Sequence, residues 1–304
     1  MTQIATRRAS LCCTVDVSYF ISISKRITVA TIKEVAKRAH VSVGTVSNVL
    51  SGTVPVSKRL QERVQEAVRQ LDYHPNYVAR SLKIRQTKTI GILVSDLTNP
   101  FIPQLVRGAE DAAWREQYML IIFNSDDQPE RESQLLTALR SRQVDGILLV
   151  AAGRAGSSHI AALRESGPPV VCLARELPGV DLDCVVADNF SAARECVKHF
   201  VDLGHRRIGL ISGDLEIATA RDRWLGYRHG LIEDGIEPDD RLVVAGGLRD
   251  ADGYRGGLKL MNGDHRPTAV MAANSMLALG FLRALRELRL ACPDQIALIT
   301  FDDP

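Results

Sequence analysis

From Thr89 onward, short apolar runs alternate with stretches of helical periodicity, and this alternation limits the possible folds more than any other feature of the chain. Each run is rich in Val, Ile and Leu, which is typical of strands covered on both faces in a parallel sheet. Stretches such as 103–117, 129–141 and 192–203 carry apolar residues at helical spacing. The runs are TIGILV, MLIIFN, GILLVA, VVCLA, VVADN, RIGLISG, LVVAGG, AVMAA and IALITFDD. Repeated strand and helix units predict a doubly wound α/β fold with parallel sheets.

A smaller unit precedes this region, and its sequence predicts three short helices. Thr31 and Glu34 have the spacing of a capping box, so a helix should begin there. Ser42 is a good N-cap for a second helix, and Ser57 is expected to cap a third. The apolar positions that would form a shared core are Ile32, Val35, Ala36, Ala39, Val46, Val49, Leu50, Leu60, Val64, Ala67, Val68 and Leu71. The first two helices, joined by a brief turn, form a candidate helix-turn-helix.

Charge is divided unevenly between the two regions. Residues 31–88 hold 11 Lys and Arg against 4 Asp and Glu, whereas residues 89–304 hold 23 against 31. A basic head on an acidic body suits a protein of which only the head approaches phosphates. A solvated basic helical surface without a DNA role is the alternative that charge alone leaves open.

The second predicted helix presents a strip of small and hydrogen-bonding side chains to solvent. Such a strip can lie against base edges, and an Asn can form a bidentate pair with adenine. The DNA-binding candidates in this helix are Ser42, Val43, Gly44, Thr45, Ser47 and Asn48.

Two consecutive segments carry a family resemblance. The segment VATIKEVAKRAHVSVGTVSNVLSG resembles the DNA-binding head of the Lac repressor family at almost every motif position, and YHPNYVARSLKIRQTKTIGIL resembles that family's hinge. The resemblance implies a homodimer, or a tetramer, on a palindromic operator, with a hinge helix at 76–83 that inserts Leu82 into the minor groove. Its hinge contacts would be Asn76, Tyr77, Ala79, Arg80, Leu82 and Lys83. Eight residues are too few for a stable isolated helix, so DNA and a partner copy should hold it; a flexible linker is the alternative.

Polar residues follow the predicted strands of the α/β region at the points where each strand ends. Ligands of open α/β sheets bind beyond the carboxyl ends of the strands, so these residues form a candidate site. An Arg fork with carboxylates and a stacking ring suits a polyhydroxyl ring, although each residue taken singly is as readily a helix cap or a loop hydrogen bond. The candidates are Asn99, Phe101, Arg175, Asp188, Thr219, Arg223, Asn274 and Asp302. Of these, Thr219 and Arg223 are expected in the loop after the sixth run, and two further acidic residues, Asp126 and Asp127, follow the second run.

The same α/β region resembles the two-lobed, periplasmic-binding-protein-like effector domain of the Lac repressor family. By that resemblance Phe101, Arg223 and Asp302 match ligand-contacting positions, and Arg175, Asp188, Thr219 and Asn274 match weaker ones. The residues that stand where the family's purine repressor uses aromatic or basic contacts are Pro100, Ile217 and Leu248. The resemblance therefore implies a small-molecule effector, with a sugar or sugar derivative favoured over a purine.

These inferences divide the chain into four parts. Residues 1–28 are expected to be a non-native or disordered leader, with Val29 as the true initiator. The helix-turn-helix domain would span 29–74, the hinge helix and linker 75–88, and the effector-binding and dimerisation domain 89–304. Members of the family continue for several dozen residues beyond this point, so we expect the C-terminus to be truncated and the last domain to be incomplete.

Other function classes are disfavoured by motifs that the sequence lacks. It has no P-loop, no strand-linked G-x-G-x-x-G and no G-x-S-x-G, so an enzyme is not expected. Its six cysteines have no paired C-x-x-C spacing, which predicts buried or free thiols in a reducing compartment and not zinc ligands or disulfides. We therefore expect no metal, and we also expect no cofactor. We expect a cytoplasmic regulator without a membrane role; the alternative from a different class is a sugar-binding receptor protein without a DNA role.

Overall fold

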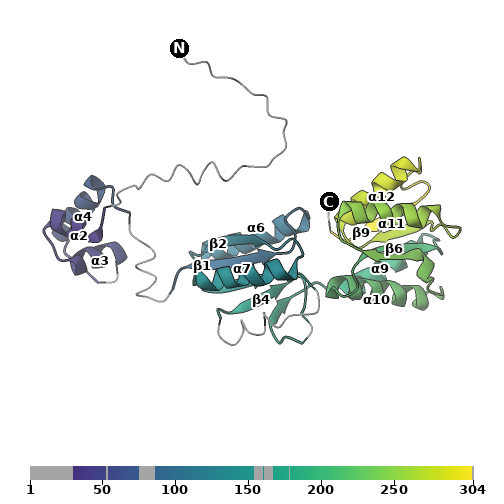
Figure 1. The fold of residues 1–304 in the computed structure, drawn as a ribbon, viewed down its shortest axis with the longest axis horizontal. Coiled ribbons are helices and arrows are strands. Elements are labelled where there is room, and N and C mark those ends of the chain that lie inside the picture. The colour runs from purple at the N-terminus through teal and green to yellow at the C-terminus, as the bar shows by residue number, and fades with distance from the viewer. Residues whose placement is uncertain are drawn as a thin grey trace, which may run out of the picture. The chain divides into compact units, whose positions relative to one another are not determined.

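The computed structural model describes residues 30–52, 54–74, 86–153, 160, 167–177 and 179–302. The chain divides into two compact units, residues 1–80 and 81–304, which we call the head and the body (Figure 1). The predicted leader and the predicted hinge contacts, from Asn76 to Lys83, lie outside the described residues. Within the described ranges, no helix is both long and apolar enough to cross a membrane.

The head contains helices α2 (Ile32–Ala39), α3 (Val43–Ser51) and α4 (Lys58–Gln70). The predicted capping box of α2 is confirmed, because Thr31 N donates to Glu34 Oε2 at 2.6 Å and Glu34 N donates to Thr31 Oγ1 at 3.4 Å. Ser42 caps α3 as predicted, since its Oγ accepts from Thr45 N at 3.0 Å. The local sequence therefore starts both helices of the helix-turn-helix.

The prediction that Ser57 caps the third helix is confirmed for its position but not for its side chain. Ser57 occupies the N-cap position of α4, but its side chain makes no capping hydrogen bond. Gln61 Nε2 instead donates to the Val56 carbonyl at 3.0 Å, and backbone bonds from Leu60 N and Gln61 N to the Ser57 carbonyl form the first turn. The helix begins where the sequence predicts, by a different set of contacts.

The head has a single small core between its three helices. The buried members are Val35, Ala36, Ala39, Val46, Val64, Ala67 and Tyr73, of which the tyrosine was not predicted. Arg63 joins α4 to the end of α2, because its Nη2 donates to the carbonyls of Ala39 at 2.6 Å and His40 at 3.1 Å. These carbonyls are left without helical partners at the end of α2, so this basic residue serves the fold of the head.

The first lobe of the body is a five-stranded sheet in which every pair of neighbours is parallel. The strand order β2-β1-β3-β4-β5 is that of a doubly wound sheet, with its switch point between β1 and β3. Its elements are β1 (Thr89–Val94), α6 (Phe101–Arg115), β2 (Met119–Asn124), α7 (Pro129–Ser141), β3 (Gly146–Leu149), β4 (Val170–Leu173) and β5 (Asp183–Val185).

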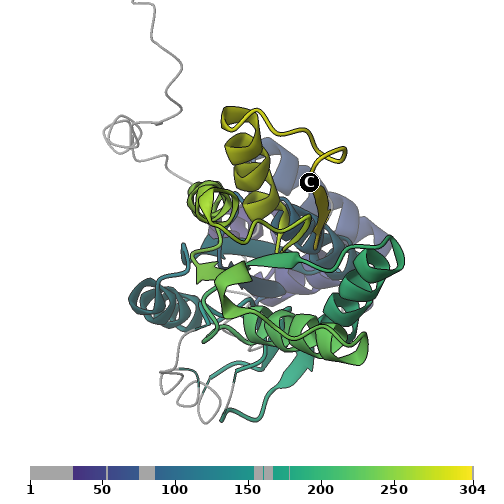
Figure 2. The same cartoon turned by 90° about the vertical axis from the view of Figure 1, so that its right-hand side faces the viewer.

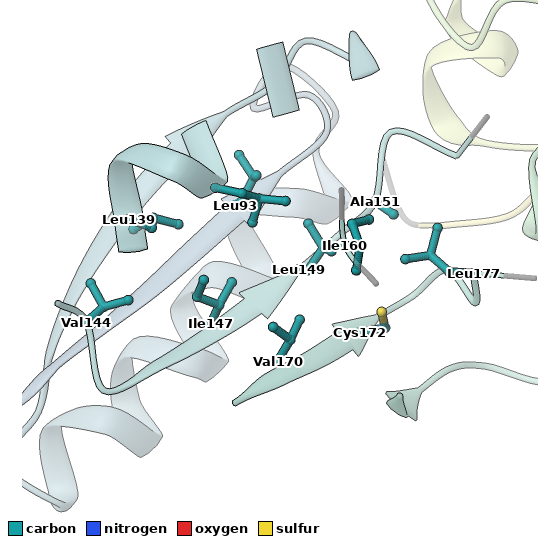
Figure 3. Packing of buried hydrophobic residues seen from close by; sticks show 11 residues of the cluster. Leu93, Leu139, Val144, Ile147, Leu149, Ala151, Ile160, Val170, Cys172 and Leu177 are labelled. Atoms are coloured by element: carbon teal, nitrogen blue, oxygen red, sulfur yellow. The ribbon is translucent and has the colours of Figure 1, made fainter. Parts of the chain in front are cut away.

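Each face of this sheet packs on its own helix. On one face Leu93, Ile147 and Leu149 belong to the same buried cluster as Leu139 of α7 (Figure 3). On the other face, the cluster against α6 is Ile92, Val94, Ile102, Val106 and Val150. Burial on both faces explains why the strand sequences lack polar alternation.

The second lobe repeats this plan with a four-stranded parallel sheet of order β7-β6-β8-β9. Helices α9 and α10 cover one face and α11 and α12 the other (Figures 1 and 2). A Cβ at Gly226 would collide with the Phe190 carbonyl, so α9 and α10 approach to a distance that requires glycine. The elements are α9 (Asn189–Asp202), β6 (Ile208–Gly213), α10 (Ala218–Glu233), β7 (Val243–Gly246), α11 (Asp250–Asn262), β8 (Ala269–Ala272), α12 (Ser275–Glu287) and β9 (Ala297–Thr300), with a short 3-10 turn at Asp240–Leu242.

Two local predictions in the body were wrong. The run at 185–189 is not a strand, because β5 ends at Val185 and Asp188 caps α9 by accepting from Ser191 N at 2.9 Å. Thr219 and Arg223 lie in the first turns of α10 and not in a loop. Both candidates thereby gain a rigid helical support.

Candidate DNA-binding surface and effector cleft

The first turns of α3 carry the six predicted DNA contacts of the head. Ser42, Val43 and Gly44 are exposed, whereas Thr45, Ser47 and Asn48 are half-buried, and Val46 between them is fully buried in the core. Val43 is a large apolar side chain that is 42% exposed, which suits contact with a thymine methyl group. The burial of Val46 fixes which face of α3 points outward.

Two of these residues bind each other. Ser42 Oγ and Thr45 Oγ1 lie 2.9 Å apart, so the hydroxyl groups hold one another while the Ser42 oxygen also caps the helix. The first backbone N–H groups of a helix have few internal partners and can hold a phosphate. The start of α3 therefore offers a fixed, polar end to the DNA backbone.

A cavity of about 620 Å³ lies in the body and is lined by residues of both lobes. Eight of the ten residues that the sequence indicated line it, all except Asp126 and Asp127: Asn99, Phe101, Arg175, Asp188, Thr219, Arg223, Asn274 and Asp302. They come from the carboxyl ends of the strands and from the helices that follow, which is where open α/β sheets bind ligands. We call this cavity the cleft.

Three polar residues of the cleft also hold the local backbone. Asn99 Oδ1 accepts from Phe101 N at 3.1 Å, and Asp188 caps α9, which holds the pKa of its carboxyl below its usual range. Asn274 caps α12 by accepting from Leu277 N at 2.8 Å, and its Nδ2 donates to the Leu248 carbonyl at 3.0 Å. A residue can therefore hold the local backbone and line the cleft at the same time, because the backbone hydrogen bond fixes the orientation of its side chain.

Arg223 is the most constrained charged residue of the cleft. Its Nε donates to Asn189 Oδ1 at 2.8 Å, its Nη1 donates to the Ala273 carbonyl, and its guanidinium lies 4.1 Å from the centre of the Phe301 ring. Burial lowers the pKa of Arg223 to about 10, although the nearby Asp302 carboxylate opposes that shift. Burial likewise raises the pKa of Asp302, and Arg223 opposes this rise. The two groups therefore form a partly desolvated pair of opposite charge.

Arg175 is the second guanidinium of the cleft and is also paired. Its Nη1 donates to Asp127 Oδ1 at 2.6 Å and to the Ala151 carbonyl at 2.7 Å. Arg175 is 8% exposed, so these contacts compensate for its burial. The positive charges of the cleft are thus balanced by carboxylates of the protein itself.

A second cavity of about 750 Å³ shares Leu248 with the cleft and also joins the two lobes. It is lined by Asp126 and Asp127 from the first lobe and by Ile217 and Arg249 from the second. The sequence reasoning passed over Arg249, as it did Asn189, the partner of Arg223. Arg249 follows β7 closely, so the rule that residues just after the strands line the site would have found it.

The described part of the chain contains no group of three or more His, Cys, Asp or Glu side chains arranged to hold a metal ion. Its four cysteines are free thiols: Cys172 is buried, Cys184 and Cys196 are half-buried and Cys292 is exposed. Burial, together with the neighbouring Cys184, raises the pKa of Cys172 to about 12, so this thiol stays protonated at neutral pH.

Comparison with known proteins assigns a family to both units. Residues 31–76 match the bacterial regulatory proteins of the lacI family, and residues 87–301 match the periplasmic binding proteins and sugar binding domain of the LacI family. The HTH-type transcriptional repressor PurR of Haemophilus influenzae (strain PittEE) is 34% identical over 90% of this chain and 81% of its own length. The ribose operon repressor of H. influenzae (strain ATCC 51907 / DSM 11121 / KW20 / Rd) is also 34% identical, over 90% of this chain and 82% of its own.

Among solved structures, the lac repressor dimer bound to operator and the anti-inducer ONPF is 26% identical, with a TM-score of 0.80. The match covers 91% of this chain and 83% of that one. These similarities confirm the predicted fold class and the prediction that the protein is not an enzyme, because its relatives are transcriptional regulators. They also set aside a sugar receptor without a DNA role, since the head itself matches the regulators. By its helix-turn-helix head and its two-lobed α/β body, the chain belongs to the lacI family of DNA-binding transcriptional regulators.

Proposed function

We propose that this protein is a cytoplasmic repressor that binds a palindromic operator as a homodimer and responds to an uncharged sugar or sugar derivative held in the cleft. The outward face of α3 reads base edges and the residues from Asn76 to Lys83 contact the minor groove. The effector changes the arrangement of the two lobes and so the affinity for DNA, a coupling that is typically 1–3 kcal/mol.

The observation that supports an effector in the cleft is that eight of the ten residues chosen for their positions after strands line one cavity. Both arginines of the cleft already have a carboxylate nearby, Asp127 for Arg175 and Asp302 for Arg223, and the Asp188 carboxylate is used to cap α9. A phosphate or an amine would add an unbalanced charge to a partly dry site, which costs free energy. An uncharged polyol can use the same groups as hydrogen-bond donors and acceptors.

The lining also favours a sugar over a purine. Leu248 lines the cleft and Ile217 lines the adjoining cavity. By the family resemblance, both stand where the purine repressor uses aromatic or basic contacts, and both are aliphatic in this chain. Whole-chain identity does not separate the two ligand classes, because the PurR and ribose repressor relatives are equally similar. The preference for a sugar over a purine therefore rests on the side chains that line the two cavities.

Thermal unfolding of the full chain with a panel of ligands tests the effector class. Neutral pentoses, hexoses and disaccharides are compared with sugar phosphates, amino sugars and purines. A ligand at 100 times its Kd adds about 2.7 kcal/mol to the free energy of unfolding. We expect stabilisation by at least one neutral sugar; stabilisation by purines or sugar phosphates alone would reject the proposal.

Arg223→Lys is the matched test of the cleft itself. Lysine keeps the charge but cannot donate in a fork to Asn189 and Ala273, so we expect a loss of at least about tenfold in affinity for the stabilising sugar. Arg221→Lys on the exposed side of the same helix is the control and should leave the Kd unchanged. Equal effects of both variants would contradict the assignment of Arg223.

Selection of duplexes from a palindromic pool, followed by gel shift, tests the DNA role. Asn48→Ala should relax the preference at one base pair of each half-site by about 1–3 kcal/mol. Leu82→Ala should abolish bending of the operator while weak, salt-sensitive binding persists. Unchanged bending would reject the assignment of the hinge wedge.

Light scattering tests the homodimer. Trp114 is 77% exposed near the end of α6, and Met119 and Ile122 are 69% and 46% exposed on the edge strand β2. Such apolar side chains at a sheet edge support contact with a second copy. A mass of twice the monomer is expected and a tetramer is the alternative result; a monomer at micromolar concentration would exclude the proposed assembly.

A further inference from the structure

Arg249 makes a contact between the two lobes that the cleft residues described above do not make. It stands between β7 and α11 in the second lobe, and its side chain reaches two carboxylates of the first lobe. Its Nε lies 3.4 Å from Asp96 Oδ2, and its Nη2 donates to Asp126 Oδ1. One guanidinium therefore bridges the loops that follow β1 and β2.

Both carboxylates are held in place for this contact. Asp96 is 8% exposed, and its Oδ1 accepts from Thr98 N at 2.9 Å and from Thr98 Oγ1 at 2.7 Å, which leaves Oδ2 toward Arg249. Asp126 has a left-handed backbone, with φ of 60°, a conformation that Asp and Asn adopt more easily than most residues. The first lobe is thus shaped to receive a cation at this point.

Arg249 is fixed on its own side as well. Its backbone N donates to Asp252 Oδ2 at 3.1 Å at the start of α11. The planar guanidinium can meet two acceptors at once, which a lysine ammonium on a flexible stem does less well. The nearby carboxylates of Asp126, Asp96 and Asp127 raise the pKa of Arg249, so its charge is constant in water.

We propose that Arg249 is a positioning residue that holds the two lobes together beside the cleft, in the adjoining cavity, through Asp96 and Asp126. The inference concerns the cavity next to the cleft of the proposed function; it rests on contacts between the lobes and needs no ligand. Since the Arg249 side chain is 53% exposed, salt screens these pairs, and the joined arrangement weakens as ionic strength rises. Salt would therefore loosen the connection between the lobes and so change the affinity of the cleft for its effector.

Hydrogen–deuterium exchange of the full chain, without effector, tests this proposal. In Arg249→Gln, amides of 95–101 and 248–253 should exchange about fivefold faster, the factor that two exposed ion pairs of ordinary strength give. Exchange in β6, at 208–213, reports on folding and should not change. Arg241→Gln is the matched control, because Arg241 pairs with Asp239 within one lobe.

Four further measurements separate a bridge between lobes from a local role at α11. Asp126→Asn should reproduce much of the effect, and the double variant should be no worse than Arg249→Gln alone. Arg249→Lys should restore part of the protection. In 1 M NaCl the wild-type chain should approach the exchange of Arg249→Gln. Unchanged exchange at 95–101 in Arg249→Gln, or additive effects in the double variant, would overturn the proposal.

Discussion

The head and the body build their sites in opposite ways. The proposed DNA-binding strip of the head is contiguous, from Ser42 to Asn48, and one short helix places it. The cleft of the body gathers residues from Asn99 to Asp302, and two sheets place them. A contiguous site depends on caps and on one buried side chain, whereas a dispersed site depends on the packing of whole layers.

The largest expected effect concerns the packing of the second lobe. Phe281 lies on α12, fully buried and close to Gly257 of α11, so Phe281→Ala should lower the free energy of unfolding of the body by about 3–5 kcal/mol. Leu203→Ala, at an exposed site after α9, is the control and should change it by less than about 0.5 kcal/mol. Urea unfolding measures both.

Hydrogen exchange of the head in the same Phe281→Ala variant sharpens the comparison. Protection of α2 to α4 should be unchanged, because their core contains no residue of the body. A parallel loss of protection in the head would mean that the two units unfold together and would remove the distinction drawn here.

A smaller effect is expected at the caps of the head. Ser42→Ala removes the bond to Thr45 N and should cost about 1 kcal/mol in the stability of the head. Ser57→Ala is its matched control, since the Ser57 side chain makes no capping bond, and should cost much less. Exchange rates of head amides in the full chain report both; equal losses would contradict the difference between the two caps.

The smallest expected effect is the pH dependence that Asp302 adds. Burial raises the pKa of this carboxyl from 3.8, so the folded chain binds its proton more tightly than the unfolded chain. Its contribution to stability is full below pH 3.8 and is lost as the pH rises through the raised pKa. Asp302→Asn should remove this decline from urea unfolding measured between pH 4 and 7. A variant that keeps the wild-type pH profile would show that another group titrates.

The strands and the start of each head helix could be predicted because their signals are local. Apolar runs of Val, Ile and Leu placed β1 and β6, and the Thr31–Glu34 spacing placed α2. The interval 185–189 could not be assigned correctly, since its apolar start resembles a strand while Asp188 is a helix cap. Ser57 shows the converse, because a good cap residue lies at the N-cap position but its side chain makes no capping bond.

What the sequence determined by itself is the order of elements, the division of charge and the eight residues after strands or at the helices that follow them. What only the tertiary structure decided is which of these groups meet. The sequence left Arg175 free to face the ligand alone, whereas in the fold it pairs with Asp127. The sequence did not single out Arg249, which the fold brings to Asp96 and Asp126. Local patterns fix the conformation of a segment, whereas contacts between residues more than a hundred positions apart depend on how the sheets and lobes pack.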